Sequence, residues 1–300
     1  MEIADKITAV GKMQAYIIAH LDEEITLESV SRVSGYSKYH ATRIFKELTH
    51  KTPFETIRAL RLTKAAQALQ GSDGKVVDVA LDSGFNSHDG FTRAFARQFD
   101  ITPQKYQQET PPVRWFVHYP LVAHYRMKEG VNPMPQEPIA RTMTVTAIER
   151  PTRKLILMRS IKATDYLSFC EERGCDWEGL FNSIPEKLDS AALLTLPPGL
   201  VIPGWGNIAS GVEVPLDYGK PIPAGCEAVI LSPCTMLYFQ GASYEVEDDF
   251  CEAISILWDL MAAYNPAPYG WQYAPELAPY FNFGASAKTG ARMVRPVCRV

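Results

Sequence analysis

Hydrophobic residues recur with helical spacing through the first part of the chain and predict that this part is all α. The clearest pattern has apolar residues at i, i+3, i+4 and i+7, the spacing of one helix face: Ala41, Ile44, Phe45 and Leu48. A second helix carries Phe91, Ala94 and Phe95 in the same way. Ser37 and Ser87, which directly precede these helices, are good N-cap residues.

A shorter helix and a glycine turn precede each of these helices. In the first copy Thr26 is a suitable N-cap, and Gly35 ends the short helix because glycine tolerates the positive φ that such a turn needs. In the second copy the short helix begins at Val76 and ends at Gly84. Each copy is therefore predicted to be a helix-turn-helix unit.

The two units repeat one sequence pattern. At a constant offset of 50 residues, Ser37, Thr42, Arg43, Phe45 and Thr52-Pro53 return as Ser87, Thr92, Arg93, Phe95 and Thr102-Pro103. Just upstream the offset is 49, so the second copy has one extra residue, Asn86, in its turn, where an insertion is tolerated. This register indicates a tandem duplication.

A long helix is predicted to join the two units. Thr52 and Glu55 have the spacing of a capping box, Pro53 occupies the first helical position, and apolar residues continue a helical pattern to Gly71. Such a helix would hold the two units at a fixed separation. With a further amphipathic helix over residues 3–20, the predicted domain over residues 1–110 is all α.

The pattern changes after residue 110. Six prolines within residues 111–143 break any long helix, so this stretch is predicted to be a linker. It begins with an aromatic patch that we expect to pack on a domain: Trp115, Phe116 and Tyr119.

Residues 144–300 are predicted to form an α+β domain. Strand-like runs cover residues 154–161, 191–196, 208–216, 227–239 and 292–300. Two helical patterns interrupt them, one over residues 169–184, which Gly174 is expected to break, and one over residues 250–261. The layout is strand, helix and two strands, repeated once.

Composition fits a soluble protein of two domains. The chain has 300 residues, twice a common domain size of about 150. It contains no apolar run of about 18 residues and no apolar signal segment, so we expect a cytoplasmic protein with no membrane partner. All six cysteines lie beyond residue 169 without a Cys-x-x-Cys pair, and we expect reduced thiols, no metal and no other cofactor.

The net charge of −4 is unusual for a protein that binds DNA, but it is unevenly distributed. Residues 1–116 carry a net charge of +1, and residues 117–300 carry −5. DNA binding by the first domain therefore requires local placement of positive side chains rather than a strong overall field.

The polar faces of the two longer helices carry the residue types that read DNA. Arg and Lys neutralise phosphates, Arg also grips guanine, and Ser, Thr, His and Tyr hydrogen-bond to base edges. The candidates are Ser37, Lys38, Tyr39, His40, Thr42, Arg43 and Lys46 in the first helix, and Ser87, His88, Asp89, Thr92, Arg93 and Arg97 in the second. Such charges are often merely solvated, but the duplicated register favours DNA binding.

Three segments, Ser34–Lys46, Asp82–Phe95 and Thr102–Tyr106, resemble the MarA/Rob-type DNA-binding domain of the AraC/XylS family of bacterial transcription regulators. The resemblance implies that both helices contact bases or the backbone of double-stranded DNA, and that RNA polymerase is a further partner. Asp89 departs from this pattern because a carboxylate beside phosphates is costly. We therefore expect the second helix to read sequence weakly or mainly to dock.

The second domain resembles GyrI-like effector-binding domains, which implies a small-molecule pocket between its two halves. Its aromatic density supports such a pocket. The candidate ligand-binding residues are Trp177, Trp205, Tyr238, Trp258, Trp271, Tyr273, Tyr280 and Asn282. Family members that sense cationic drugs resemble one another in a Glu-x-Tyr pattern, where this chain has Asn282-Phe283-Gly284, so we expect an aromatic or lipophilic ligand that is not a cation.

Our first hypothesis is a sequence-specific DNA-binding transcriptional regulator whose second domain senses a small-molecule effector. One alternative is a GyrI-like hydrolase fused to a DNA-binding domain, since some GyrI-like domains hydrolyse reactive small molecules. Another is a regulator whose acidic second domain binds a protein partner without a ligand. The sequence offers no triad, metal spacing or phosphate loop, so we expect no enzymatic activity.

Overall fold

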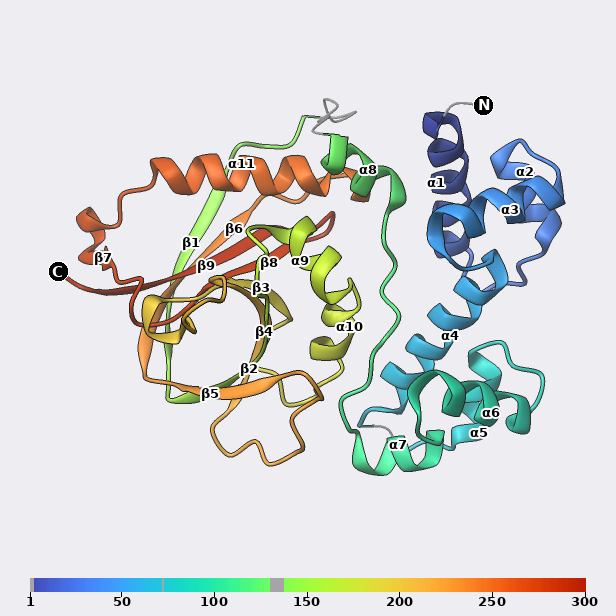
Figure 1. The fold of residues 1–300 in the computed structure, drawn as a ribbon, viewed down its shortest axis with the longest axis horizontal. Coiled ribbons are helices and arrows are strands. Elements are labelled where there is room, and N and C mark those ends of the chain that lie inside the picture. Colours follow the sequence, from blue (N-terminus) through green and yellow to red (C-terminus); the bar gives the residue numbers. More distant parts are fainter. Residues whose placement is uncertain (1–2, 72, 130–137) are drawn as a thin grey trace. The chain divides into compact units, whose positions relative to one another are not determined.

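The computed structural model describes residues 3–71, 73–129 and 138–300. The chain divides into two compact units, Met1–Glu129 and Gly130–Val300. The first unit is helical, and the second is built on an antiparallel sheet with helices (Figure 1). The predicted fold class, an all-α domain followed by an α+β domain, is confirmed.

Helices make up the first unit, and they begin at the predicted caps. Thr26 Oγ1 accepts from Ser29 N at 3.1 Å, and Gly35 adopts a φ of 74° after the short helix. The helices of its described part are α1 (Ile3–Ala19), α2 (Leu27–Ser34), α3 (Lys38–Thr49), α4 (Pro53–Leu69), α5 (Val76–Asp82), α6 (His88–Phe99), α7 (Pro103–Glu109) and α8 (Leu121–Glu129). Both predicted helix-turn-helix units, α2–α3 and α5–α6, are therefore present.

The connecting helix α4 belongs to two apolar cores. Ile57 and Leu60 pack with α1, α2 and α3 in the first core. Leu62, Ala65 and Leu69 pack with α5, α6 and α7 in the second. Because interiors are close-packed, a helix shared by two cores fixes the two helix-turn-helix units relative to each other.

The predicted linker over residues 111–143 differs from the structure. Trp115 lies in the second core, while Phe116 and Leu121 pack on the first. Phe116 N donates to Thr63 Oγ1 at 2.9 Å, and α8 packs against α1. Prolines interrupt regular structure over residues 111–120, but the apolar residues between them still gain free energy by leaving water. Residues 113–129 thus belong to the first unit, and residues 130–137 lie outside the described residues.

Antiparallel strands form one curved sheet in the second unit. Those described are β1 (Met143–Arg150), β2 (Arg153–Arg159), β3 (Ala192–Thr195), β4 (Ile208–Pro215), β5 (Glu227–Leu231), β6 (Cys234–Gly241), β7 (Trp271–Tyr273), β8 (Tyr280–Ser286) and β9 (Gly290–Arg299). Their order is β1-β6-β9-β8-β3-β4-β2-β5, and β7 pairs with β9. The first half of the unit contains β1 to β4, and the second half contains β5 to β9. The halves meet at the central β3–β8 pair. The first strand of each half pairs with a strand of the other half: β1 pairs with β6, and β5 pairs with β2.

The strands that the sequence prediction missed depend on pairing rather than on their own pattern. Most residues of β1 are exposed, β7 has three residues, and β8 contains a register shift between Asn282 and Ala285. The run over residues 227–239 is two strands, because Ser232 and Pro233 separate β5 from β6. Each helical region therefore follows two strands rather than one.

Three helices cover one face of this sheet: α9 (Tyr166–Arg173), α10 (Trp177–Asn182) and α11 (Phe250–Ala263). Gly174 separates α9 from α10, as predicted. The side chain of Ile156 packs with α9 and α10, and those of Leu155 and Leu157 point to a second core on the opposite face, because side chains alternate along a strand. The six cysteines are free thiols.

Candidate functional site

The outer face of α3 is exposed and basic. Burial of Ala41, Ile44 and Phe45 turns the other side of this helix to solvent. There the Tyr39 side chain is 79% exposed, and Arg43 is also exposed. A groove of about 320 Å³ is lined by Leu27, Lys38, Tyr39, Thr42, Arg43 and Lys46. The structure thus brings five of the seven predicted α3 residues together around one hollow.

The contacts on this face leave its charged groups available. Lys38 Nζ lies 3.2 Å from Glu28 Oε2, and Thr42 Oγ1 donates to Lys38 O at 2.8 Å. An exposed ion pair stabilises a protein by only about 0.2–1 kcal/mol, so Lys38 can exchange this carboxylate for a phosphate at little cost.

Ser37 and His40 make local contacts within this unit. Ser37 Oγ accepts from His40 N at 3.4 Å as the N-cap of α3. The half-buried His40 ring packs on Tyr36, with ring centroids 4.9 Å apart. Neither residue lines the groove. A cap and a ring contact hold these two residues, and their contacts with DNA stay predictions.

An acidic neighbour on α3 is neutralised locally. Glu47 follows Lys46 and would repel phosphates, but Lys6 Nζ lies 2.6 Å from Glu47 Oε1. This hydrogen bond lowers the pKa of Glu47 below its usual value. The pair joins α1 to α3 across 41 positions in sequence, which no local pattern shows.

The second helix, α6, presents a sparser face. Ser87 Oγ accepts from Gly90 N at 3.2 Å as its N-cap, which leaves His88 and Asp89 exposed in its first turn. Arg93 and Arg97 are also exposed, and the described residues include no ion pair of either one. The α6 face therefore offers two arginines and one opposing carboxylate.

Thr92 is less accessible than its neighbour Arg93 on α6. This residue is half-buried, and its Oγ1 is shielded from solvent with no hydrogen-bond partner among the described residues. A shielded hydroxyl is less accessible to a base edge than the neighbouring Arg93 side chain.

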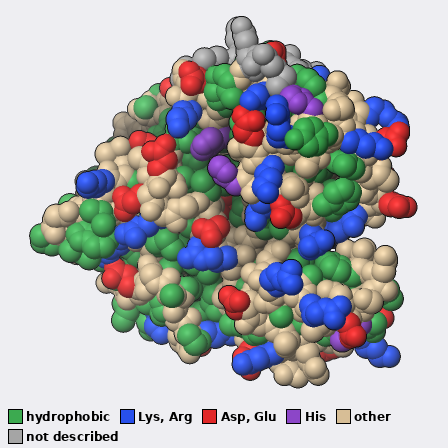
Figure 2. Space-filling view, turned by 45° about the vertical axis from the view of Figure 1, so that its right-hand side comes forward, with side chains coloured by type: hydrophobic (Ala, Val, Ile, Leu, Met, Phe, Trp, Pro, Cys, Tyr) green, Lys and Arg blue, Asp and Glu red, His purple; other side chains and the backbone are tan. Residues whose placement is uncertain are grey.

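Charges of both signs are interspersed on the surface. Figure 2 shows Lys and Arg side chains among Asp and Glu over the face in view, without one large patch of a single sign. This distribution agrees with the net charge of −4 and means that any attraction for DNA comes from local groups.

A pocket of about 270 Å³ lies in the second unit, at the central β3–β8 pair. Both halves of the unit contribute to it. Its lining residues are Thr164, Asp165, Tyr166, Leu193, Leu194, Thr195 and Ile208 from the first half, and Trp258, Met261, Tyr280, Phe281, Asn282, Met293, Val294 and Arg295 from the second.

Four predicted ligand-binding residues lie at or beside this pocket. Trp258, Tyr280 and Asn282 line it. Tyr273 does not line it, but its ring centroid is 5.5 Å from the guanidinium carbon of Arg295, which does. Asn282 Oδ1 accepts from Gly284 N at 2.9 Å, so the amide oxygen is occupied within the irregular part of β8.

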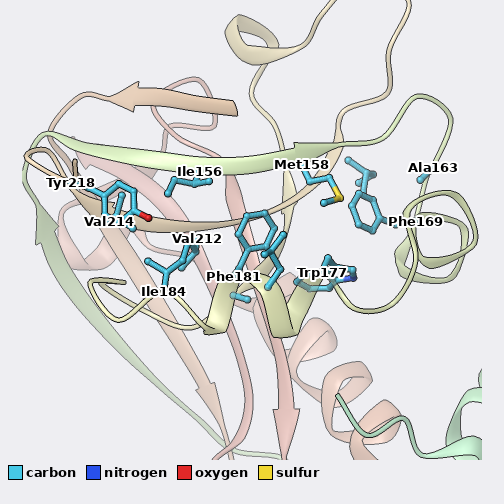
Figure 3. Close-up of a cluster of buried hydrophobic side chains, with 13 residues drawn as sticks. Ile156, Met158, Ala163, Phe169, Trp177, Phe181, Ile184, Val212, Val214 and Tyr218 are labelled. Atoms are coloured by element: carbon cyan, nitrogen blue, oxygen red, sulfur yellow. The ribbon is translucent and has the colours of Figure 1, made fainter. Parts of the chain in front are cut away.

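The other four predicted ligand-binding residues lie elsewhere. Trp177 is buried in the core of α9, α10 and the sheet (Figure 3). Trp205 is exposed and lies near Arg173. The Tyr238 hydroxyl accepts a hydrogen bond from Arg150. Trp271 stacks on Arg299, whose guanidinium carbon is 3.8 Å from the ring centroid. Each ring has a protein partner outside the pocket, so aromatic density alone did not locate the site.

Sequence reasoning missed Arg295, although a signal was available. Met293, Arg295 and Val297 alternate along the predicted strand over residues 292–300, and the two apolar members pack under α11. Strand alternation puts Arg295 on that same face.

The described acidic residues do not gather into a metal site. Glu213 is buried, and its Oε1 lies 2.5 Å from Arg153 Nε. Among the described residues, no group of three or more His, Cys, Asp or Glu side chains is placed to hold a metal ion. The helices of the described part include none that is both long and apolar enough to cross a membrane.

Comparison with known proteins places the first unit among regulators. A family model described as a helix-turn-helix domain matches residues 30–109, which include α3 and α6. Regulatory protein SoxS of Escherichia coli K12 is 40% identical over 93 residues, which are 31% of this chain and 87% of SoxS. Transcriptional regulator Rob of Salmonella typhimurium LT2 is 36% identical over 118 residues, which are 37% of this chain and 41% of Rob.

A solved structure, the C-terminal domain of EcmrR, is 15% identical, with 53% of this chain and 99% of that domain covered and a TM-score of 0.33. No property is carried over from a likeness at that level. The match to SoxS is different, because it spans most of SoxS at 40% identity. Together with the duplicated helix-turn-helix units, it shows that this chain belongs to the AraC family of helix-turn-helix transcriptional regulators.

Proposed function

We propose that this DNA-binding regulator presents α3 and α6 to successive major grooves of a promoter site, and that a small-molecule effector in the second unit changes its affinity for DNA or its contact with RNA polymerase. Such a role places the protein in the cytoplasm. The observation that carries the DNA part is the exposed groove face of α3, formed by Lys38, Tyr39, Thr42, Arg43 and Lys46.

The helix-turn-helix geometry supports this role. In such units the second helix enters the major groove, with its first turns at the base edges. In α3 these turns carry Lys38, Tyr39 and Thr42, while Arg43 and Lys46 continue the same face. The shared cores of α4 hold α6 in a fixed relation to α3, as binding of one duplex by both helices requires.

The pocket supports the effector part. It is concave, mostly apolar in its lining, and formed by both halves of the second unit, as the resemblance to GyrI-like domains implies. A ligand acts as an effector only if it binds one of two arrangements of the protein more tightly than the other. A pocket that joins two halves across the β3–β8 pair is a suitable place for such a preference.

Salt dependence of DNA binding tests the DNA part. Affinity for a promoter duplex should fall linearly with salt on a log–log plot, because phosphate contacts release counterions. Lys46→Ala should reduce the magnitude of the slope by about one if Lys46 contacts a phosphate. The matched control is Lys162→Ala, which removes an exposed lysine of the second unit and should leave the slope unchanged. A wild-type protein with no salt dependence would contradict the proposal.

A further inference from the structure

Arg295 lies inside a cage of aromatic rings at the pocket. Its guanidinium carbon is 5.2 Å from the Tyr280 ring centroid and 5.5 Å from the centroids of Trp258 and Tyr273. These rings come from β8, α11 and β7, and they surround a side chain that itself lines the pocket. The positive charge of the site is thus built into the protein, at the place where an aromatic cage would otherwise receive a cationic ligand.

The charge of Arg295 has no acidic partner among the described residues. Other arginines of the sheet do: Arg153 pairs with Glu213 at 2.5 Å, Arg159 with Glu227, and Arg292, on the same strand as Arg295, with Asp189 at 2.7 Å. Arg295 makes no such ion pair, and its Nε is shielded from solvent without a hydrogen-bond partner in the described part of the chain. A shielded donor on a charged group costs free energy until an acceptor binds it.

The one carboxylate among the described lining residues is already engaged. Asp165 Oδ1 accepts from Ser168 N at 2.9 Å, and Oδ2 accepts from Thr164 Oγ1 at 3.0 Å. Asp165 is thereby the N-cap of α9, and the hydrogen bond from the Ser168 backbone is the main reason that its pKa is lowered. Its role in the fold is set, and the described contacts include no ion pair between Asp165 and Arg295.

We propose that the pocket binds a small aromatic carboxylate, whose carboxylate group pairs with Arg295. The planar guanidinium fork matches a carboxylate with two parallel hydrogen bonds. Tyr166, Phe281 and Met293 offer apolar contacts to an aromatic ring. The volume of about 270 Å³ limits the ligand to a molecule smaller than most drugs. This inference rests on the proposed effector-binding function and names the charge and class of its ligand.

Three compounds of nearly equal shape test the charge of the ligand: naphthoate, naphthamide and naphthylmethylammonium. Their affinities for the full chain are measured by titration calorimetry, with thermal shift as a second readout. Naphthoate should bind at least about tenfold more tightly than the amide, since a charged hydrogen-bonded pair adds more than about 1.4 kcal/mol. The ammonium compound should bind most weakly, because it meets a like charge.

Substitution of Arg295 then assigns the preference to this residue. Arg295→Gln should bring naphthoate down to the affinity of naphthamide, while Arg295→Lys, which keeps the charge without the fork, should retain part of the difference. The matched control is Arg299→Gln, on the same strand and also stacked on an aromatic ring, but outside the pocket lining. It should leave the preference intact.

The outcomes separate this inference from the proposed function. Tightest binding of the ammonium compound or of the amide would overturn the inference while leaving an effector pocket. Unchanged preference in Arg295→Gln would also overturn it. Absence of binding by all three compounds would count against both the aromatic ligand class and the effector function. If Arg295→Gln does not fold, the test uses the order of the three affinities on the unmodified chain and on Arg295→Lys. Loss of part of the preference for naphthoate in Arg295→Lys would then assign that preference to Arg295, and an unchanged preference would overturn the inference.

Discussion

Arg43 and Arg93 hold the same position in the two repeated units, and both are exposed. Their surroundings differ. Arg43 lines a groove with Lys38 and Lys46, whereas Arg93 shares its helix with the exposed carboxylate of Asp89. Equal position with unequal surroundings supports the proposal that α3 mainly reads sequence and α6 mainly docks.

Replacement of Arg43 by Ala tests that assignment. The loss of one bidentate contact to a base should weaken binding to the best site by about 1–3 kcal/mol and relax the preference at one base position. The measurement is the affinity for a set of duplexes that differ by single base pairs. Arg141→Ala, at an exposed residue of the second unit, is the control for the loss of charge. An equal loss on every duplex would make Arg43 a backbone contact.

Single residues were predictable where their role is local. Ser37 and Ser87 cap their helices because the cap depends on neighbours within three positions. The contact of His40 with Tyr36 was not predictable, because it depends on how α3 packs after the turn. Strand alternation could have indicated which face of β9 carries Arg295, but not its ring partners, because these come from three different elements.

The connecting helix α4 is the element on which the paired geometry depends. Thr52 Oγ1 accepts from Glu55 N at 3.3 Å, and Thr52 N donates to Glu55 Oε2 at 2.7 Å, so the predicted capping box is confirmed. Its helix then passes through both cores of the first unit. A weaker start of α4 should therefore reduce the stability of the whole unit.

Thr52→Ala measures this effect. Loss of the cap should lower the free energy of unfolding by about 0.5–2 kcal/mol, seen in urea denaturation followed by helical circular dichroism. Thr8→Ala is the control, because Thr8 is an exposed residue within α1 and caps no helix. Equal stability of Thr52→Ala and the unmodified chain would show that the cores alone hold α4.

Helices and strands were predictable from sequence where hydrophobic residues recur at a regular spacing and form one buried face, as in α3, α6 and α11. The edge strand β1 shows no such pattern, because most of its residues are exposed and its place comes from pairing with β6. Residues 113–129 were assigned to a linker because residues 113–120 pack without regular structure, which leaves no period to read, and α8 is short. The aromatic patch of Trp115, Phe116 and Tyr119 indicated that this stretch packs on a domain, and Trp115 and Phe116 do pack on the cores of the first unit.

At the scale of the molecule, two-domain architecture follows from the change of period along the sequence, and the chain divides into two such units. The exchange of β1 and β5 between the halves is non-local, so no pattern in the sequence predicted it. The resemblance to GyrI-like domains implied a pocket between the halves, and the predicted ligand-binding residues include only part of the lining of the pocket found there. The central claim concerns the first unit: both repeated helices bind one duplex at the same time.

Hydroxyl-radical footprinting on a selected promoter site, at saturating protein, tests that claim most directly. We predict two protected segments on one side of the duplex, about 10 base pairs apart, because successive major grooves on one side are separated by one helical turn. Arg43→Ala and Arg93→Ala should each weaken a different segment. A single protected segment, or two segments that both persist unchanged in Arg93→Ala, would contradict simultaneous binding by α3 and α6.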